Sequence, residues 1–224
     1  MLPVDTIAIS PGNKALFQKF IARQLAYPTG WFGRFYIAGW LNKANLAMNE
    51  FTLQQLSTSS EDRILEIGFG GGDLLEKILS TKASEYVAGV DLSVEMVNVV
   101  DRRLRPYIQS GRAEVRRADI EALPYANREF TKVCSVNTLY FWRNPSVALA
   151  ECHRVLRPGG EILLCFNSRE ALEAWPCHKY GFRLYDLVEA ENLLKTSGFT
   201  TIKVVSAHDS KQGLFYCVSA LSAK

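Results

Sequence analysis

Long uncharged apolar runs are missing from this sequence of 224 residues. The longest apolar runs, FYIAGWL at 35–41 and VCSVNTLYFW at 133–142, are far shorter than the roughly 18 residues that a membrane span requires. The first residues also lack a basic segment followed by an apolar core and a small-residue cleavage site, the pattern of a secretion signal. We therefore expect no membrane span and a cytoplasmic protein.

Neither sign of charge dominates, and cysteine pairs at metal-binding spacing are absent. The 26 Lys and Arg residues stand against 23 Asp and Glu residues, for a net charge of +3, without a long run of like charges. Because an electrostatic DNA or RNA binder shows a strong basic excess, no nucleic-acid partner is expected. The five cysteines form no C-x-x-C pair, so we predict no metal site and free thiols in a reducing compartment.

Short β-rich runs alternate with segments of helical periodicity from residue 63 onward. The runs predict seven strands, at 63–67, 86–90, 113–117, 130–136, 161–166, 201–205 and 214–221. Apolar residues three and four positions apart predict helices at 73–81, 94–106, 145–156 and 186–197. This alternation is typical of an α/β fold with a Rossmann-like, mostly parallel sheet and helices on both faces. Because about eight residues separate the last two runs, too few for a helical crossover, the last strand is expected to be antiparallel.

Residues 1–60 contain no strand-like run and are predicted to form an N-terminal helical extension, before a main domain at 61–224. Helices are expected near 13–24 and 38–56, joined by an aromatic stretch at 28–36. The aromatic residues of this region recur at helical spacing, and Trp31, Phe35 and Tyr36 are candidates for an acceptor pocket. Three interpretations remain open: core packing, a lid that closes an apolar pocket, or a surface that touches a membrane.

A glycine-rich loop follows the first predicted strand. Gly68-Phe69-Gly70-Gly71-Gly72 leads into a helix that begins near Asp73, and such a loop lets the backbone approach a ligand closely. In open parallel sheets, ligands bind at the carboxyl ends of the strands, so we expect a nucleotide-like cofactor here. A dinucleotide fingerprint requires glycine where Asp73 stands, and the negative charge of Glu66 attracts a cationic ligand rather than a pyrophosphate.

Two further acids end the second and third predicted strands. Asp91 lies 23 residues after Gly68, where a carboxylate can accept both hydroxyls of a ribose, a spacing shared by NAD and adenosyl cofactors. Asp119 follows the third strand and is placed to accept the exocyclic amine of an adenine, with Leu92 and Ile120 on the faces of the ring.

Five segments together resemble one family: ILEIGFGGG (64–72), VAGVDLS (87–93), ADIEALPY (118–125), VNTLYFW (136–142) and RVLRPGGEILL (154–164). The chain resembles class I S-adenosylmethionine-dependent methyltransferases of the small-molecule group related to quinone C-methyltransferases. The resemblance implies S-adenosyl-L-methionine as cofactor and S-adenosyl-L-homocysteine as product. It places Glu66 near the methionine amino group, Asp91 on the ribose and Asn137 beside the sulfonium. The implied cofactor residues are Glu66, Gly68, Phe69, Gly70, Gly72, Asp91, Leu92, Asp119, Ile120 and Asn137.

The expected reaction is in-line transfer of a methyl group to a small, apolar or aromatic acceptor. Such a transfer needs mainly positioning in a dry site, so a general base is optional, and His178 is the candidate. Tyr140 and Trp142 follow the fourth strand and are further candidates for the acceptor pocket. Two alternatives stay open: a noncatalytic module that binds an adenosyl ligand and, against the indications of Asp73 and Glu66, an NAD-dependent oxidoreductase.

Overall fold

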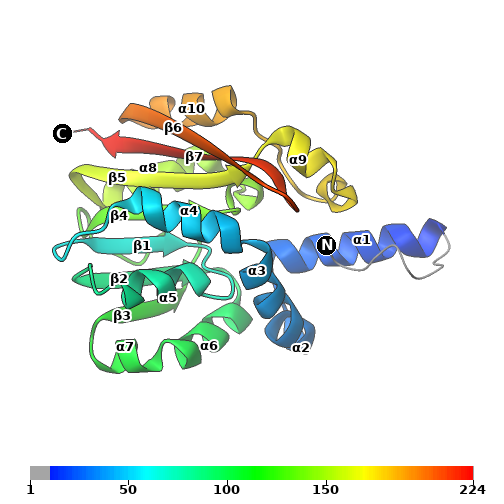
Figure 1. Cartoon of the computed structure of the whole chain (residues 1–224), viewed down its shortest axis with the longest axis horizontal. Coiled ribbons are helices and arrows are strands. Elements are labelled where there is room, and N and C mark those ends of the chain that lie inside the picture. Colours follow the sequence, from blue (N-terminus) through cyan, green and yellow to red (C-terminus); the bar gives the residue numbers. More distant parts are fainter. Residues whose placement is uncertain (1–10, 224) are drawn as a thin grey trace.

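The computed structural model describes residues 11–223 and contains one seven-stranded sheet. The strand order is β3-β2-β1-β4-β5-β7-β6 (Figure 1). The strands are β1 (Arg63–Ile67), β2 (Tyr86–Asp91), β3 (Ala113–Arg117), β4 (Phe130–Val136), β5 (Leu156–Asn167), β6 (Phe199–Asp209) and β7 (Gly213–Ser222). The order reverses between β1 and β4, which is where an open parallel sheet binds its ligands.

Strand directions confirm the predicted α/β fold. Strands β3, β2, β1, β4 and β5 are parallel to one another, whereas β7 is antiparallel to both β5 and β6. The antiparallel hairpin at the end of the chain therefore agrees with the length argument.

Strand β5 is longer than predicted. Strand β5 begins at Leu156 rather than 161, so Pro158, Gly159 and Gly160 lie within the strand instead of before it. The register between β4 and β5 shifts between Phe130 and Lys132, and Gly159 has a φ of +76° that most side chains do not tolerate. The glycines therefore carry the strand through an irregularity rather than ending it.

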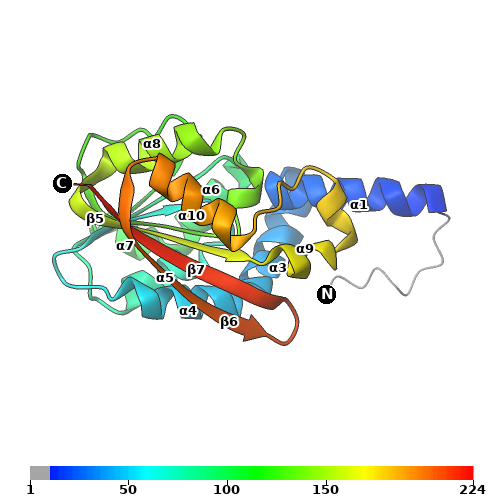
Figure 2. The same ribbon diagram turned by 90° about the horizontal axis from the view of Figure 1, so that it is seen from above.

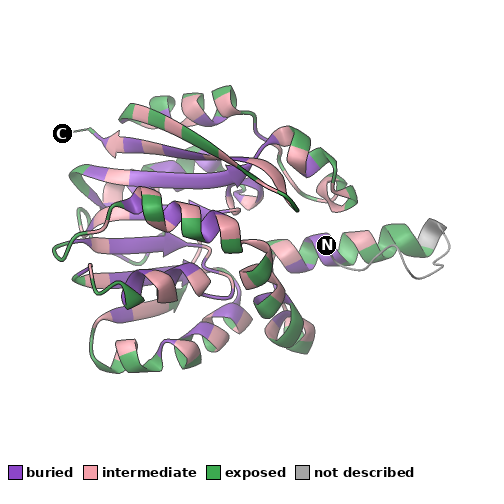
Figure 3. Ribbon diagram, viewed as in Figure 1, coloured by how far each residue is buried: buried purple, intermediate pink, exposed green. Residues whose placement is uncertain are grey.

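Helices cover both faces of the sheet (Figure 2). One face carries α4 (Leu46–Leu56), α5 (Asp73–Ser80) and α6 (Val94–Arg103), and the other carries α8 (Pro145–Val155) and α10 (Leu187–Thr196). Each face has its own apolar core, seen as the buried strands and inward helix sides in Figure 3. Shorter helical elements connect them: η2 (Leu139–Phe141), α9 (Arg169–Glu173) and η3 (Pro176–Lys179).

The helix expected at 94–106 is two helices, because α7 (Arg105–Gln109) follows α6 after a break at Leu104. Pro106 stands in the first turn of α7. Proline has no N–H to donate within a continuous helix, so a new helix begins where that donor is not needed.

The N-terminal residues form consecutive helices: α1 (Pro11–Ala26), α2 (Gly30–Phe32), the π-helical segment η1 (Gly33–Ile37) and α3 (Ala38–Ala44). The stretch at 28–36 is thus mostly helical, and α1 projects beyond the body of the molecule (Figure 1). Helix α4 instead belongs to the body, since Met48 and Leu56 are fully buried in the core beside α5. The predicted extension contains residues 1–10, which lie outside the described residues. Between residues 11 and 223, no helix has the length and apolarity to cross a membrane.

Candidate cofactor site

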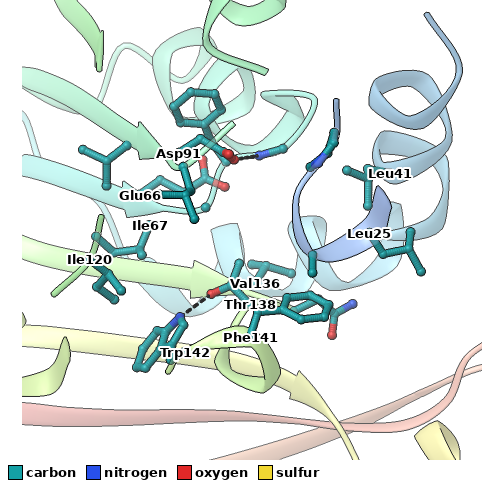
Figure 4. A pocket seen from close by; sticks show the side chains of 18 of the residues that line it. Leu25, Leu41, Glu66, Ile67, Asp91, Ile120, Val136, Thr138, Phe141 and Trp142 are labelled. Atoms are coloured by element: carbon teal, nitrogen blue, oxygen red, sulfur yellow. Dashed lines mark hydrogen bonds between the residues drawn. The ribbon is translucent and has the colours of Figure 1, made fainter. Parts of the chain in front are cut away.

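A cavity of about 170 Å³ opens at the carboxyl ends of β1, β2 and β4. Glu66, Asp91 and the glycine loop line one side, and Leu25 and Leu41 from the N-terminal helices lie opposite (Figure 4). The cavity is therefore bounded jointly by the α/β body and the N-terminal helices.

The glycine loop lies against this cavity because its backbone adopts conformations that suit glycine. Gly68 and Gly70 have φ values of +69° and +50°, and a Cβ on Gly68 would lie 2.5 Å from the Thr138 methyl group. Gly68, Phe69, Gly70 and Gly71 line the cavity. Gly72 does not line the cavity. It is the residue before α5 and has a φ of +77°, and Val100 leaves no room there for a Cβ.

Glu66 is a buried carboxyl with an unused acceptor. Its side chain is 3% exposed, and Oε2 has no hydrogen-bond partner within the described chain. Burial, together with the nearby carboxylates Asp73 and Asp91, raises the pKa of Glu66 to about 8. A buried acceptor without a partner is costly, so this oxygen is suited to a cationic donor.

Asp91 connects the end of β2 to the glycine loop. Its Oδ2 accepts the Gly70 N–H at 3.0 Å, and its Oδ1 accepts the Ser93 N–H at 2.8 Å. Burial raises the pKa of Asp91 to about 6, although both hydrogen bonds act in the opposite direction. Each oxygen keeps a lone pair for a hydroxyl group of a ligand.

The residues predicted around an adenine also line the cavity: Leu92, Asp119 and Ile120. Asp119 accepts the Glu121 N–H at 3.0 Å and forms a 2.7 Å ion pair with Arg143. The side chain of Arg143 is 74% exposed, so this ion pair is at the mouth of the cavity and is screened by solvent.

Asn137 stands between this cavity and a second, smaller one, and lines both. Its backbone has a φ of +56°, a conformation that asparagine tolerates. Its Nδ2 donates to Asn45 Oδ1 at 2.9 Å, and its Oδ1 accepts the Tyr140 hydroxyl at 2.8 Å. Asn137 therefore joins α4, η2 and the end of β4 at the boundary between the two cavities.

The second cavity has a volume of about 60 Å³, and its lining includes five aromatic side chains. The Trp40 and Trp175 rings lie 5.7 Å apart, and Tyr140, Phe141 and Phe182 pack together. Its polar lining includes Asn167, whose Oδ1 is buried without a hydrogen-bond partner in the described chain. This cavity fits a small apolar or aromatic group that brings one hydrogen-bond donor.

The candidate acceptor residues are divided between cavity and surface. Trp142 lines the first cavity, where its indole N–H donates to Thr138 at 3.1 Å, and Tyr140 lines the second. Trp31, Phe35 and Tyr36 line neither cavity and are 59–68% exposed, because α2 and η1 direct them away from the body.

The candidate base His178 also lies outside both cavities. It belongs to η3, where its Nδ1 meets the Trp175 carbonyl oxygen at 2.5 Å.

Three asparagines that line the first cavity were not predicted from the sequence as site residues. Asn42, Asn45 and Asn49 line the first cavity from α3 and the start of α4. Asn42 donates to the Gly71 carbonyl at 3.2 Å, and Asn49 donates to Asp73 at 3.0 Å. Spacings of three and four place all three on one helical face, so an uncharged polar stripe in the expected helix was the available signal.

Comparison with known proteins shows that this chain is similar to methyltransferases. The family model described as "Methyltransferase domain" matches residues 65–164. An uncharacterized methyltransferase, YdaC of Bacillus subtilis, is 32% identical over 136 residues, which are 60% of this chain and 73% of that protein. A ubiquinone/menaquinone biosynthesis C-methyltransferase, UbiE of Geotalea daltonii, is 29% identical over 115 residues. That match covers 51% of this chain and about half, 49%, of the Geotalea protein.

Solved structures share the fold at low sequence identity. A SAM-dependent methyltransferase from Aquifex aeolicus has a TM-score of 0.69 at 18% identity, over 83% of this chain and 97% of that one. A geranyl diphosphate methyltransferase, solved with GPP and sinefungin, has a TM-score of 0.68 at 16% identity, over 82% and 79%.

Proposed function

This chain belongs to the class I S-adenosylmethionine-dependent methyltransferases, and on that premise we propose that it methylates a small, apolar or aromatic acceptor. The observation that carries the proposal is the pair of adjoining cavities, one with two buried carboxyl groups and one with aromatic walls. The first suits a cationic nucleoside cofactor, and the second suits the acceptor.

The residues of the first cavity fit S-adenosylmethionine. The unpartnered Glu66 oxygen would hold the methionine amino group, and Asp91 would hold the ribose hydroxyls. Leu92, Asp119 and Ile120 would frame the adenine, while Gly68, Phe69 and Gly70 offer backbone to the rest. Gly72 contributes by shaping the loop and starting α5 rather than by contact.

When bound, S-adenosylmethionine supplies a methyl group on a sulfonium, whose thioether leaving group needs no protonation. The protein then has to exclude water and hold the acceptor in line. Trp40, Trp175 and Phe182 exclude water from the second cavity, and Asn137 orients groups at its boundary with the first. The unpartnered Asn167 oxygen favours an acceptor that carries a hydroxyl or N–H group.

The apolar character of the acceptor has independent support. The Geotalea relative is named for methylation in ubiquinone and menaquinone biosynthesis, and quinone rings are planar and largely apolar. We assign no general base, because His178 meets a backbone carbonyl outside both cavities.

Calorimetric titration with S-adenosylmethionine, S-adenosylhomocysteine and NAD tests the cofactor. We expect the two adenosyl ligands to bind and NAD not to bind. The Asp91→Asn variant should bind them about 10- to 100-fold more weakly, since a hydrogen bond to a charged group contributes about 1.5–3 kcal/mol. Asp101→Asn, on an exposed part of α6, is the matched control and should bind normally. Binding of NAD alone would favour an oxidoreductase and overturn the proposal.

Production of S-adenosylhomocysteine with a panel of acceptors tests the second cavity. The panel contains a phenol, a naphthohydroquinone and a hydrophilic amine, and we expect turnover with the aromatic compounds only. Trp175→Ala should raise the acceptor KM and leave the cofactor affinity unchanged. Cofactor binding without turnover of any acceptor would instead indicate a noncatalytic adenosyl-binding module.

A further inference from the structure

The N-terminal helices expose a continuous aromatic face. Leu16, Phe20, Trp31, Phe35 and Tyr36, here called the aromatic face, are each 43–68% exposed. The ring of Phe20 lies 5.4 Å from that of Phe32, which stacks on Tyr36 at 5.5 Å, and Tyr36 meets Trp31 edge to face at 5.7 Å. The face therefore runs unbroken from α1 across α2 to η1, on the part of the molecule that projects from the body (Figures 1 and 3).

Exposure of aromatic rings is confined to this face and its neighbour Phe17. Within residues 11–223, every exposed Phe, Trp or Tyr lies between Phe17 and Tyr36, whereas the aromatic residues of the body are buried or half-buried. Large contiguous apolar patches on a protein surface mark sites of interaction. The aromatic face is also separate from the reaction site, because none of its five residues lines either cavity.

The surrounding charge is of one sign. Residues 11–49 contain five cations and no Asp or Glu, although the whole chain carries a net charge of only +3. Lys19 and Arg23 are four positions apart on α1 and run beside Leu16 and Phe20, which have the same spacing. No carboxylate of the described residues pairs with any of these five cations, which are Lys14, Lys19, Arg23, Arg34 and Lys43.

We propose that the aromatic face and its cations dock on an anionic lipid surface. Trp and Tyr are favoured at the boundary between water and lipid, and Lys and Arg beside them attract anionic headgroups. A second copy of this chain is a poorer occupant, because a symmetric contact through this face would bring two sets of five positive charges together. The charge and the aromatic composition thus favour the same partner.

Docking in this way would bring the reaction site close to the lipid. Ala26 at the end of α1 and Pro28 in the segment before α2 line the first cavity, and the Pro28 carbonyl accepts the Ser93 hydroxyl at 2.6 Å. The aromatic face and this part of the cavity wall therefore both lie within residues 16–36. The docking itself does not depend on methyl transfer, so it is measured without turnover.

Flotation with lipid vesicles tests the proposal. We expect the full chain to bind vesicles made of equal parts phosphatidylcholine and phosphatidylglycerol, and not vesicles of phosphatidylcholine alone. Binding should weaken as salt is added, because salt screens the cations. Equal binding to both vesicles, or binding to neither, would overturn the proposal.

Two pairs of variants separate the charge from the apolar contact. Lys19→Glu with Arg23→Glu, and Leu16→Ser with Phe20→Ser, should each reduce vesicle binding at least about tenfold. Val188→Ser on α10 and Lys203→Glu on β6, both exposed elsewhere, should bind as the natural sequence does. S-adenosylhomocysteine binding serves as the folding check for every variant.

The oligomeric state in solution shows whether a second copy of this chain, rather than lipid, covers the aromatic face. If analytical ultracentrifugation shows a dimer that the face variants convert to a monomer, a second copy covers the face and the lipid proposal is wrong. A monomer that still floats with anionic vesicles supports it.

Discussion

The buried carboxyl group of Glu66 lowers the stability of the cofactor-free protein and at the same time suits the binding of a cationic ligand. It is buried beside Asp73 and Asp91, with one oxygen unpaired, and its pKa is raised from 4.5 to about 8. Such a residue weakens the cofactor-free fold at neutral pH and gains its partner only with a cationic ligand. Two predictions follow from that position.

The first concerns stability without cofactor. Between pH 4.5 and 8 the unfolded chain ionises Glu66 while the folded protein keeps it protonated, so the unfolded state binds fewer protons. Each pH unit in that range then lowers the free energy of unfolding by about 1.4 kcal/mol from this group, and the decline ends above pH 8. We expect Glu66→Gln to be increasingly more stable than the natural sequence as pH rises, measured by urea unfolding. Glu173→Gln, exposed on α9, should show no such trend.

The second concerns affinity. A cationic amino group needs the ionised form of Glu66, so S-adenosylmethionine should bind more tightly as pH rises from 6 to 8, across the range set by the raised pKa values of Asp91 and Glu66. Calorimetry over this range should give a pH dependence that the Glu66→Gln variant loses, together with weaker binding. An unchanged pH profile in the variant would show that another group controls the affinity.

At the scale of elements, the contact between α3 and the glycine loop holds the N-terminal helices against the cavity. The Gly71 carbonyl accepts hydrogen bonds from Asn42 at 3.2 Å and from Arg103 on α6 at 2.9 Å. A Cβ on Gly71 would overlap the Ala38 carbonyl oxygen and the Asn42 side chain. The loop therefore fits between two helices only while residue 71 has no side chain.

Two glycine substitutions test this packing in opposite directions. Gly71→Ala should push α3 off the loop, lower the melting temperature and weaken S-adenosylhomocysteine binding at least about tenfold, as overpacking commonly costs about 1–3 kcal/mol. Gly39→Ala places its Cβ in open space on the same helix and should stabilise it by about 0.5–1 kcal/mol. Thermal unfolding and calorimetry measure both, and a harmless Gly71→Ala would mean that α3 shifts freely.

At the scale of the whole molecule, the first cavity joins two parts of the chain that are far apart in sequence. Glu66 and Asp91 come from the sheet, whereas Leu25, Pro28 and Asn42 come from the N-terminal helices and the segment that connects them. A ligand that touches both parts should stabilise both.

Hydrogen exchange measured by mass spectrometry tests this coupling. Addition of S-adenosylhomocysteine should slow amide exchange in residues 25–49 as well as in the glycine loop, because the bound state has to open before either part exchanges. Exchange in α10, on the opposite face of the sheet, should change little. Protection limited to residues 66–72 and 91–93 would contradict a cofactor enclosed by the N-terminal helices.

The sequence predicted the sheet better than the helices in front of it. Strand periodicity predicted the seven strands, and the short connection before β7 predicted its antiparallel direction, although the strand order was not predicted. The acids at the ends of β1 and β2 do lie at one cavity. The positions of Trp31 and Asn42 could not be predicted, because helical spacing shows which residues share a face and not which neighbour that face meets. Asn42 faces the cavity and Trp31 faces solvent only through the way the helices pack after η1.

The cysteines, finally, make the natural sequence ready for site-selective labelling. Cys134, Cys152, Cys165 and Cys217 are buried, and Cys177 alone is partly accessible. It lies in η3, two residues from Trp175 in the wall of the second cavity, and burial raises the pKa of its thiol, so reaction with maleimides should be slow and favoured by alkaline buffer. A fluorophore attached there would report on acceptor entry without any engineered residue.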